Sequence, residues 1–349
     1  MYKSLAAIHL KKNKDVILDE ITFSSPAPDE VILKNEYAGI CHSQLINLSR
    51  TPENPELLGH EGTAEVVAIG NKVKHLKEGD KAIVSWMPNQ YSNDKEYLKW
   101  TSFYYQNVRY RSLIYNWSKY SKINSQFVTK LNKNENSKIY SIMGCAVISA
   151  YLAVEKIVSK KNFNSLVLGA GGLGSLAVNA LKNLKAKNNI VLDKSKKKLM
   201  FAKKIGCTHL INNTFENLEK KVMHITKNKG LDYIFDFTGN KSLQESCLKI
   251  LSKGDPGYSS GGTLAIIGFS YDDISFSAKN LLMNNQTIVG MRGGWCNSKK
   301  DFPKLKNKIN NNIVKIKDII TEEHKLKNIN KVIKKFKDNK ILGRAVIKL

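Results

Sequence analysis

The segment 164–193 constrains the fold of this chain more than any other. A short apolar run leads into the glycine turn GAGGLG, an amphipathic pattern follows, and a second apolar run ends in Asp193. This order predicts a strand, a tight turn, a helix and a second strand, which is the first unit of a doubly wound parallel sheet.

The glycines of this turn suit the binding of a dinucleotide. Gly169 allows the tight turn, Gly171 leaves room for a pyrophosphate, and Gly174 lets the helix pack closely on the sheet. Free N–H groups at the helix N-terminus attract the same anion. The predicted cofactor contacts of the turn are Gly169, Gly171, Gly172, Leu173 and Gly174.

Asp193 bears on which dinucleotide is bound. It lies nineteen residues after Gly174, where the ribose hydroxyls of an adenosine are expected. Because a carboxylate would repel a 2′-phosphate, we predict NAD(H) rather than NADP(H). The lysines 194 and 196–198 would instead favour NADP(H). Lys198 is a further candidate cofactor contact.

The length of 349 residues suggests two domains. No apolar run approaches the roughly 20 residues of a membrane span, and the N-terminal stretch carries lysines where a secretory signal would be apolar. The five cysteines are odd in number and far apart, unlike a disulfide framework. We therefore expect a soluble, cytoplasmic protein without a membrane partner.

The net charge of +26 raises the question of nucleic-acid binding. Only five of the 56 basic residues are arginine, and the lysines are spread along the chain among many asparagines. This distribution is typical of codon bias rather than of a selected binding face. We therefore predict no nucleic-acid partner.

The N-terminal region contains candidate metal ligands. Short apolar runs separated by glycine turns predict a small β-rich domain there. Cys41 lies in GICHSQ, His60 in LGHEG, and Cys145 in IMGCAVISA. Two thiolates and one imidazole suit a catalytic Zn²⁺ with an open fourth position. Spacing alone leaves the alternative that each cysteine is a small buried hydrophobe.

The order of these motifs resembles that of the medium-chain, zinc-dependent alcohol dehydrogenase family over essentially the whole chain. The shared elements are GICHS, GHEG, GDKAIVSW, the Gly-Cys pair at Cys145, GAGGLG and the closing GRAVIKL. The resemblance implies an α/β fold with a GroES-like β-rich catalytic domain, residues 1–147 and 290–349. A Rossmann domain with a doubly wound parallel sheet, residues 148–289, would bind NAD(H).

The resemblance also implies roles for individual residues. It identifies Cys41, His60 and Cys145 as the ligands of one catalytic zinc, with Glu61 as a carboxylate beside the metal. Ser43 resembles the hydroxyl that takes the substrate's proton, and His42 the neighbour of the cofactor pyrophosphate. Arg344 matches an arginine that pairs with that pyrophosphate, a role suited to a planar guanidinium.

The alternation of strands and helices continues after Asp193 and reaches a sixth strand, which fits the doubly wound sheet. Thr238, with Asp236 and Gly239, follows one strand, and Gly268 follows another. The ends of these strands lie on the cofactor edge of such a sheet. Thr238 and Gly268 are therefore candidate contacts of the adenine or nicotinamide half.

The sequence departs from the family in the segment 86–120. Many members hold a second, structural zinc there with four cysteines, but this segment has none, so we expect that zinc to be absent. Nine aromatic residues lie instead between Tyr97 and Tyr120. They could replace the metal by packing or by a subunit contact, or they could form an altered entrance for a charged or aromatic ligand.

Two further departures lie beside the predicted metal ligands. Gln44 stands where the family commonly has an aspartate, and Ile46 where many members have a histidine that passes the proton to solvent. The proton would then leave from Ser43 directly, through the cofactor ribose or through water.

These features predict a zinc-dependent alcohol dehydrogenase or carbonyl reductase that transfers hydride between an alcohol and NAD(H). Zinc would act as the Lewis acid on the substrate oxygen, and Ser43 would accept the proton. A homodimer or homotetramer is expected. The alternatives are a polyol, sugar or phosphorylated-alcohol dehydrogenase, and a non-catalytic protein that binds nucleotide or nucleic acid.

Overall fold

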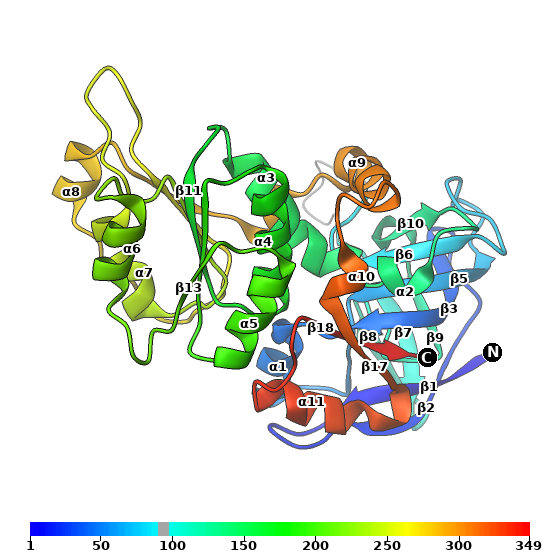
Figure 1. Ribbon diagram of the computed structural model, residues 1–349. Helices are drawn as coiled ribbons and strands as arrows, with labels where there is room; N and C mark the ends of the chain where they lie inside the picture. Colours follow the sequence, from blue (N-terminus) through cyan, green and yellow to red (C-terminus); the bar gives the residue numbers. More distant parts are fainter. Residues whose placement is uncertain (90–97) are drawn as a thin grey trace. The chain divides into compact units, whose positions relative to one another are not determined.

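The computed structural model describes residues 1–89 and 98–349 and divides them into two compact units. Unit 1 comprises Met1–Cys145, Asn297–Lys304 and Ile320–Leu349, and unit 2 comprises Ala146–Cys296 and Leu305–Ile319. Figure 1 shows the elements of both units. Tyr97, one of the aromatic residues counted in the sequence, lies outside the described residues.

Unit 1 contains two sheets that are antiparallel except for the parallel pair β17 and β18. The first sheet has the order β4(Glu56–Leu57), β1(Tyr2–His9), β2(Ile17–Phe23), β7(Thr101–Tyr105), β8(Val108–Ser112). The second has the order β10(Val128–Leu131), β6(Lys81–Ser85), β5(Glu61–Ile69), β3(Glu30–Gly39), β18(Arg344–Lys348), β17(Ile320–Lys325), and β9(Tyr120–Asn124) also pairs with β3.

The sheets of unit 1 bury their apolar side chains in two clusters. One cluster includes Ile8, Phe23, Val31 and Phe103, and the other includes Trp117 and Ile347. The second is covered by α11(Ile329–Lys337), whose Ile329, Val332 and Ile333 are buried at helical spacing. Short segments α1(His42–Leu48), η1(Ser125–Phe127), α2(Ser137–Tyr140) and η4(Leu326–Asn328) connect the strands.

Unit 2 is built on six parallel strands in the order β13(His209–Ile211), β12(Asn188–Leu192), β11(Asn164–Leu168), β14(Tyr233–Asp236), β15(Thr263–Ile266), β16(Thr287–Gly290). The first strand along the chain is central and the order reverses beside it, as in a doubly wound sheet. The strands β11 and β12 consist almost entirely of buried residues, as expected for parallel strands covered on both faces. The predicted fold class is confirmed.

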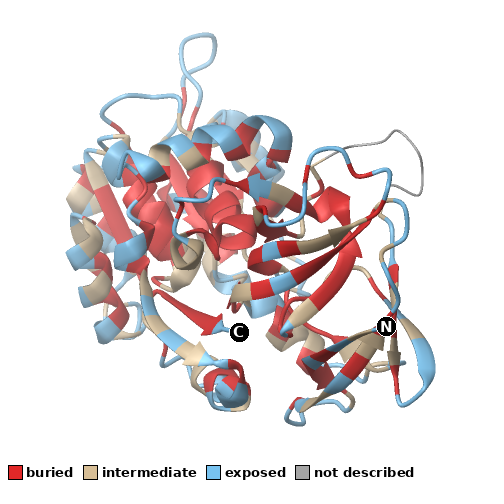
Figure 2. Cartoon of the chain, turned by 90° about the vertical axis from the view of Figure 1, so that its right-hand side faces the viewer, coloured by how far each residue is buried: buried red, intermediate tan, exposed pale blue. Residues whose placement is uncertain are grey.

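Helices before, between and after these strands complete unit 2. They are α3(Ala153–Ile157), α4(Gly172–Asn183), α5(Lys196–Ile205), α6(Leu218–Thr226), α7(Lys241–Ile250), α8(Ala278–Met283) and α10(Ile316–Ile319), with the turn η3(Arg292–Trp295). The helix α9(Ser298–Asn310) belongs partly to each unit. Buried residues, red in Figure 2, run through the strands and the inner helix faces.

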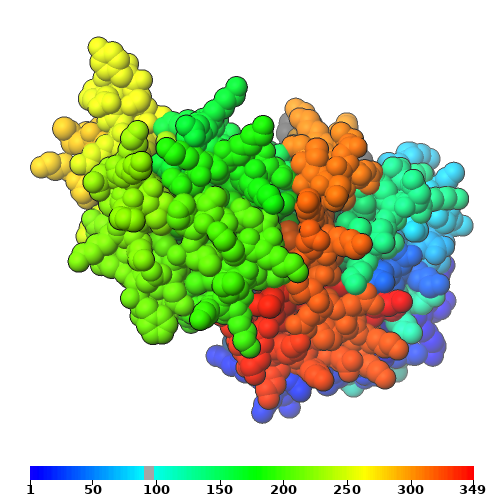
Figure 3. Space-filling model, in the orientation of Figure 1, coloured from blue at the N-terminus to red at the C-terminus, as the bar shows by residue number. Residues whose placement is uncertain are grey.

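One loop and the character of the helices complete the description of the fold. The loop 255–260 between α7 and β15 is exposed and projects from unit 2, where Figure 3 shows it in yellow. Among the described residues, no helix has both the length and the apolar character that a membrane crossing requires.

Candidate active site

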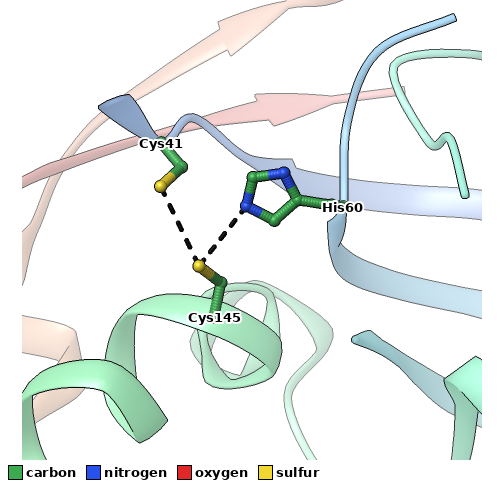
Figure 4. A group of neighbouring side chains, drawn as sticks. All are labelled: Cys41, His60 and Cys145. Atoms are coloured by element: carbon green, nitrogen blue, oxygen red, sulfur yellow. Dashed lines mark hydrogen bonds between the residues drawn. The ribbon is translucent and has the colours of Figure 1, made fainter. Parts of the chain in front are cut away.

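Three side chains from separate parts of unit 1 converge at one point. Cys41 directly precedes α1, His60 directly precedes β5, and Cys145 lies in the π-helix η2(Met143–Leu152). The Sγ atoms of Cys145 and Cys41 are 3.9 Å apart, and Nε2 of His60 is 3.3 Å from Sγ of Cys145 (Figure 4). All three potential ligand atoms lie within 4.8 Å of one another.

Glycines bring the backbones of two of these residues into place. Gly59 has a φ of +99°, a left-handed conformation that side chains disfavour, and it turns the chain before His60. A Cβ on Gly144 would lie 2.2 Å from the carbonyl oxygen of Val84, so only glycine lets Cys145 approach β6 this closely. The sequences LGHEG and MGCAV therefore contain both the reactive group and the glycine that positions it.

Hydrogen bonds couple the pKa values of the three side chains. The hydrogen bond from the Cys145 thiol lowers the pKa of Cys41 well below its usual value. That bond, together with burial, raises the pKa of Cys145. Burial alone would lower the pKa of His60, but the hydrogen bond and the charge of Cys41 raise it above its usual value. The hydrogen bonds of this cluster therefore favour the thiolate form of Cys41.

Gln44 connects Cys41 and His60. Its Oε1 accepts a hydrogen bond of 2.7 Å from the backbone N–H of Cys41, and its Nε2 lies 2.8 Å from Nδ1 of His60. The side chain is buried. Sequence comparison with the family marked Gln44 only as a departure, although a glutamine three residues into a helix is a known capping signal.

Glu61 and Arg344 form a buried ion pair beside this cluster. Glu61 begins β5 and Arg344 begins β18, and Nη2 of Arg344 donates to Oε1 of Glu61. A Cβ on Gly39 would lie 2.5 Å from the same carboxylate oxygen, which explains the glycine at the end of β3. Among the described residues, the buried Nε of Arg344 has no hydrogen-bond acceptor.

His42 and Ser43 form the first turn of α1, directly after Cys41. Both side chains are exposed. The ring of His42 also lies edge-on to that of Phe336, with 6.1 Å between the ring centroids. Ser43 thus offers an accessible hydroxyl two residues from a potential metal ligand.

In unit 2 the glycine turn has the geometry that the sequence predicts. Gly169 has a φ of +93°, and a Cβ on Gly174 would lie 1.8 Å from the carbonyl oxygen of Gly169. A Cβ on Gly171 would meet no atom within 4 Å, so this glycine borders open space at the N-terminus of α4. Gly172 and Leu173 are the first residues of that helix.

Asp193 lies next to this turn. Its carboxylate accepts hydrogen bonds of 2.8 Å from the backbone N–H groups of Ala170 and Ser195. Lys198, in the first turn of α5, is buried; burial lowers its pKa, while the charge of Asp193 opposes this effect. The turn and the carboxylate that follows the second strand are thus held together at one sheet edge.

Thr238 and Gly268 lie at the same edge. Thr238 follows β14, and its hydroxyl donates to Asp236 at 2.6 Å, while Gly268 follows β15 and donates its N–H to the carbonyl oxygen of Asp236 at 2.8 Å. A Cβ on Gly169 would lie 3.0 Å from Cγ2 of Thr238. The structure therefore gathers the cofactor residues predicted in unit 2 around the carboxyl ends of β11, β12, β14 and β15.

Comparisons with known families agree with both units. Residues 27–132 match the family described as "Alcohol dehydrogenase GroES-like domain", and residues 172–311 match "Zinc-binding dehydrogenase". Together these segments span more than half of the chain.

Individual proteins match over almost their whole length. The S-(hydroxymethyl)glutathione dehydrogenase of Haemophilus influenzae is 24% identical, with 99% of this chain and 97% of that protein covered. Alcohol dehydrogenase 2 of Tanacetum cinerariifolium is also 24% identical, with 94% and 92% covered. The crystal structure of benzyl alcohol dehydrogenase from Acinetobacter calcoaceticus superposes with a TM-score of 0.88 at 21% identity and covers 100% of both chains.

Proposed function

Because the chain belongs to the zinc-binding, medium-chain alcohol dehydrogenase family, we propose that it transfers hydride between an alcohol and NAD(H) at the Cys41–His60–Cys145 cluster. It is a zinc-dependent alcohol dehydrogenase and thus an NAD(P)-dependent oxidoreductase.

The convergence of Cys41, His60 and Cys145 is the observation that carries the proposal. Two thiols and one imidazole within 4.8 Å of one another form a donor set that suits Zn²⁺ and leaves a fourth position for substrate. Zinc held there would supply a Lewis acid for the oxygen of the alcohol or carbonyl group. Cys145 and Glu61 are buried and Cys41 and His60 are half-buried, which limits the access of water to this site.

Ser43 is the proposed proton acceptor. Its hydroxyl is exposed two residues after Cys41, and a hydroxyl can accept one proton while it donates its own. Ile46 in the same helix has no titratable group, so the proton would leave Ser43 directly, through the cofactor ribose or through water. His42 is proposed to neighbour the cofactor pyrophosphate.

The glycine turn supports the proposed NAD(H) site. The open space beside Gly171 and the close packing at Gly174 suit a pyrophosphate at the N-terminus of α4. Asp193 would bind the adenosine ribose and repel a 2′-phosphate, which favours NAD(H) over NADP(H). Lys198, Thr238 and Gly268 remain proposed contacts.

Arg344, like His42, is a proposed cofactor residue of unit 1. Its Nη2 is used by Glu61, whereas its Nε has no acceptor among the described residues. A buried guanidinium with a free donor suits an anionic ligand such as a pyrophosphate. This supports the proposed role, while the ion pair with Glu61 fixes the orientation of the side chain.

The names of similar proteins indicate which substrates to try first. The relatives are described as acting on S-(hydroxymethyl)glutathione and benzyl alcohol. We therefore propose a primary alcohol, or the corresponding aldehyde in the reverse direction, as substrate. A polyol, sugar or phosphorylated alcohol is the alternative, and we propose no nucleic-acid or membrane partner.

The aromatic segment after β6 is proposed to stand in for a structural zinc. Phe103 packs against Tyr110 and Tyr115, with ring centroids 5.7 Å and 6.2 Å apart, and Tyr115 and Trp117 are buried. Burial of aromatic rings supplies packing energy that a metal would otherwise provide. This supports the interpretation that aromatic packing replaces the metal.

We further propose a homodimer or homotetramer. The strand β16 is at the edge of its sheet, and α8 has no buried residue, with Leu282 and Met283 largely exposed. An unpaired edge beside apolar side chains favours association with another chain.

Two further proposals concern domain boundaries and location. We propose a catalytic domain of residues 1–147 and 290–349 and a cofactor domain of residues 148–289. We also propose a cytoplasmic location, which is consistent with five cysteines outside disulfides.

Turnover with matched variants tests the function. The purified, zinc-loaded protein is expected to reduce NAD with primary alcohols, and Cys145→Ser is expected to lose both zinc and turnover while it keeps NADH affinity. Cys207→Ser, which alters a buried cysteine of unit 2, is the control and should keep turnover. Full turnover by the Cys145→Ser variant would contradict the proposed site.

A further inference from the structure

A cavity of about 670 Å³ in unit 1 is lined by residues that none of the proposed zinc or cofactor roles uses. Its walls come from the chain after β2, the start of β3, the segment before and along β7, and the strands β8 and β9. We propose that this cavity binds a phosphate monoester attached to a planar ring. The residues that carry this inference are Ser24, Trp100, Arg109, Arg111 and Lys122.

Two arginines on β8 face the cavity together. Arg109 and Arg111 are two residues apart on one strand, so their side chains point to the same face of the sheet. Tyr110 between them points to the other face, where it packs against Phe103. Among the described residues, neither guanidinium has a hydrogen-bond or ion-pair partner.

Two arginines this close together in the sequence are unusual in this chain. Only five of its 56 basic residues are arginine, and two of them flank one tyrosine. Neighbouring like charges without an anion repel each other, whereas a phosphate could accept forked hydrogen bonds from both guanidinium groups. The geometry therefore suits an anion that bridges the two side chains.

The buried Lys122 orients the hydroxyl group of Ser24 as a third hydrogen-bond donor beside the two arginines. The side chain of Lys122 is 3% exposed, and its Nζ donates to Oγ of Ser24 at 3.2 Å and lies 3.3 Å from Oε2 of Glu30. Because an ammonium group has no acceptor, the Ser24 oxygen must accept this bond. The hydroxyl proton of Ser24 is then left to donate to a ligand in the cavity.

The charge balance of the wall indicates the charge of the ligand. Glu30 neutralises one of the three cations Arg109, Arg111 and Lys122, which leaves two positive charges. A phosphate monoester carries a charge of about −1.5 to −2 at neutral pH. A dianion of this class would match the wall, whereas a carboxylate would leave one positive charge unpaired.

Trp100 indicates what is attached to the phosphate. Its side chain lines the cavity and is 52% exposed, although an indole is a large apolar group. Trp100 precedes Ser102 by two residues, and Ser102 pairs with Arg111 across the strands. Trp100 and both arginines line the same cavity, so a planar ring joined to the phosphate could stack on the indole.

Phenyl phosphate is the probe that tests this site. Calorimetric titration at low ionic strength uses the zinc-loaded protein saturated with NADH, so that the proposed dinucleotide site is already filled. One saturable site is expected, and Arg109→Gln/Arg111→Gln should weaken binding at least about tenfold. The double variant Lys11→Gln/Lys12→Gln, which removes the same charge from exposed positions, should leave it unchanged.

A second variant separates the ring from the phosphate. Trp100→Ala should lower the affinity for phenyl phosphate to that for inorganic phosphate, and it should not change the affinity for inorganic phosphate itself. Three results would overturn the proposal: no saturable binding, binding that the arginine variant does not weaken, or equal affinity of the natural protein for phenyl phosphate and inorganic phosphate.

Discussion

The amide of Gln44 holds Nδ1 of His60 at 2.8 Å while it accepts the backbone N–H of Cys41 at 2.7 Å. Because its oxygen is used by Cys41, its nitrogen must face His60 and donate to Nδ1. A histidine that binds a metal through Nε2 carries its proton on Nδ1 and donates it to an acceptor. With zinc bound, a proton on Nδ1 would face the donor nitrogen of Gln44, so zinc binding must break this hydrogen bond or turn the amide.

Gln44→Glu should therefore tighten zinc binding. Glutamate has the same shape, and its two oxygens can accept from Cys41 and His60 together, so the affinity for zinc should rise about tenfold. Competition with a chromogenic chelator measures this change. Gln44→Leu, which removes both bonds, should bind zinc more weakly than the natural protein, and a Glu variant no tighter than the natural protein would refute the argument.

Ser43→Ala should reduce turnover without loss of zinc or NADH. General acid–base groups contribute about 10²-fold or more to rate, so kcat should fall by roughly that factor. Steady-state kinetics and metal content on one preparation give both values. Ser49→Ala, at the other end of the same helix, is the control and should keep kcat within about twofold. Equal kcat for both variants would remove Ser43 from the mechanism.

Asp193→Asn should shift the cofactor preference. The amide keeps one acceptor for Ala170 or Ser195 but loses the charge that would repel a 2′-phosphate. We expect about tenfold weaker NADH binding and tighter NADPH binding. Fluorescence titrations with the two reduced cofactors measure their ratio, and an unchanged ratio would mean that Asp193 does not contact the ribose.

Breaking the pair of Glu61 and Arg344 should destabilise unit 1. Arg344→Met leaves a buried carboxylate without its guanidinium, which costs about 3–5 kcal/mol. Urea unfolding of the metal-free protein, followed by circular dichroism, gives the free energy of unfolding. The double variant Glu61→Gln/Arg344→Met should recover part of the loss, and additive losses would show that the two residues are energetically independent.

Asp80 should make stability depend on pH on the acid side. Burial would raise its pKa, but hydrogen bonds from Lys130 and the backbone N–H of Lys77 lower it below the ordinary value of 3.8. The carboxylate therefore stabilises the fold above the unfolded pKa, and this contribution is lost as pH falls through the lower folded pKa.

The comparison with Asp80→Asn measures this contribution. At neutral pH the variant should be about 1–2 kcal/mol less stable, because it loses a charged partner of two donors. The difference should stay constant down to about pH 5 and shrink below about pH 4. A difference that does not change between pH 7 and pH 3 would exclude Asp80 as its source.

The sequence predicts the glycine turn of unit 2 more directly than the metal-ligand cluster of unit 1, because the turn depends on local patterns and the cluster on long-range contacts. The turn at Gly169, the helix α4 and Asp193 follow one another within one βαβ unit, so local patterns suffice to predict them. Cys145 lies 85 residues from His60 and 104 from Cys41, and only contacts between distant parts of the chain bring these three residues together. Their convergence was predicted through the family resemblance, not through spacing.

Other features depend on side-chain direction and could not be predicted. The position of Gln44 in GICHSQ is compatible with a capping bond to Cys41, but nothing there indicates that the same amide reaches His60, because that depends on the path of two chain segments. Likewise, the arginines 109 and 111 share a face with Trp100 only once β7 and β8 pair in the observed register. Sequence therefore identified the chemical groups, and the fold determined which of them meet.

The metal content of protein purified without chelator tests the central claim most directly. Mass spectrometry of the natural protein should find about one zinc per chain, as expected for a single catalytic site with three protein ligands. The variant Cys41→Ser/Cys145→Ser should contain almost none while it still binds NADH. Natural protein without zinc, or a double variant that retains it, would contradict the assignment of Cys41, His60 and Cys145 as the catalytic zinc ligands.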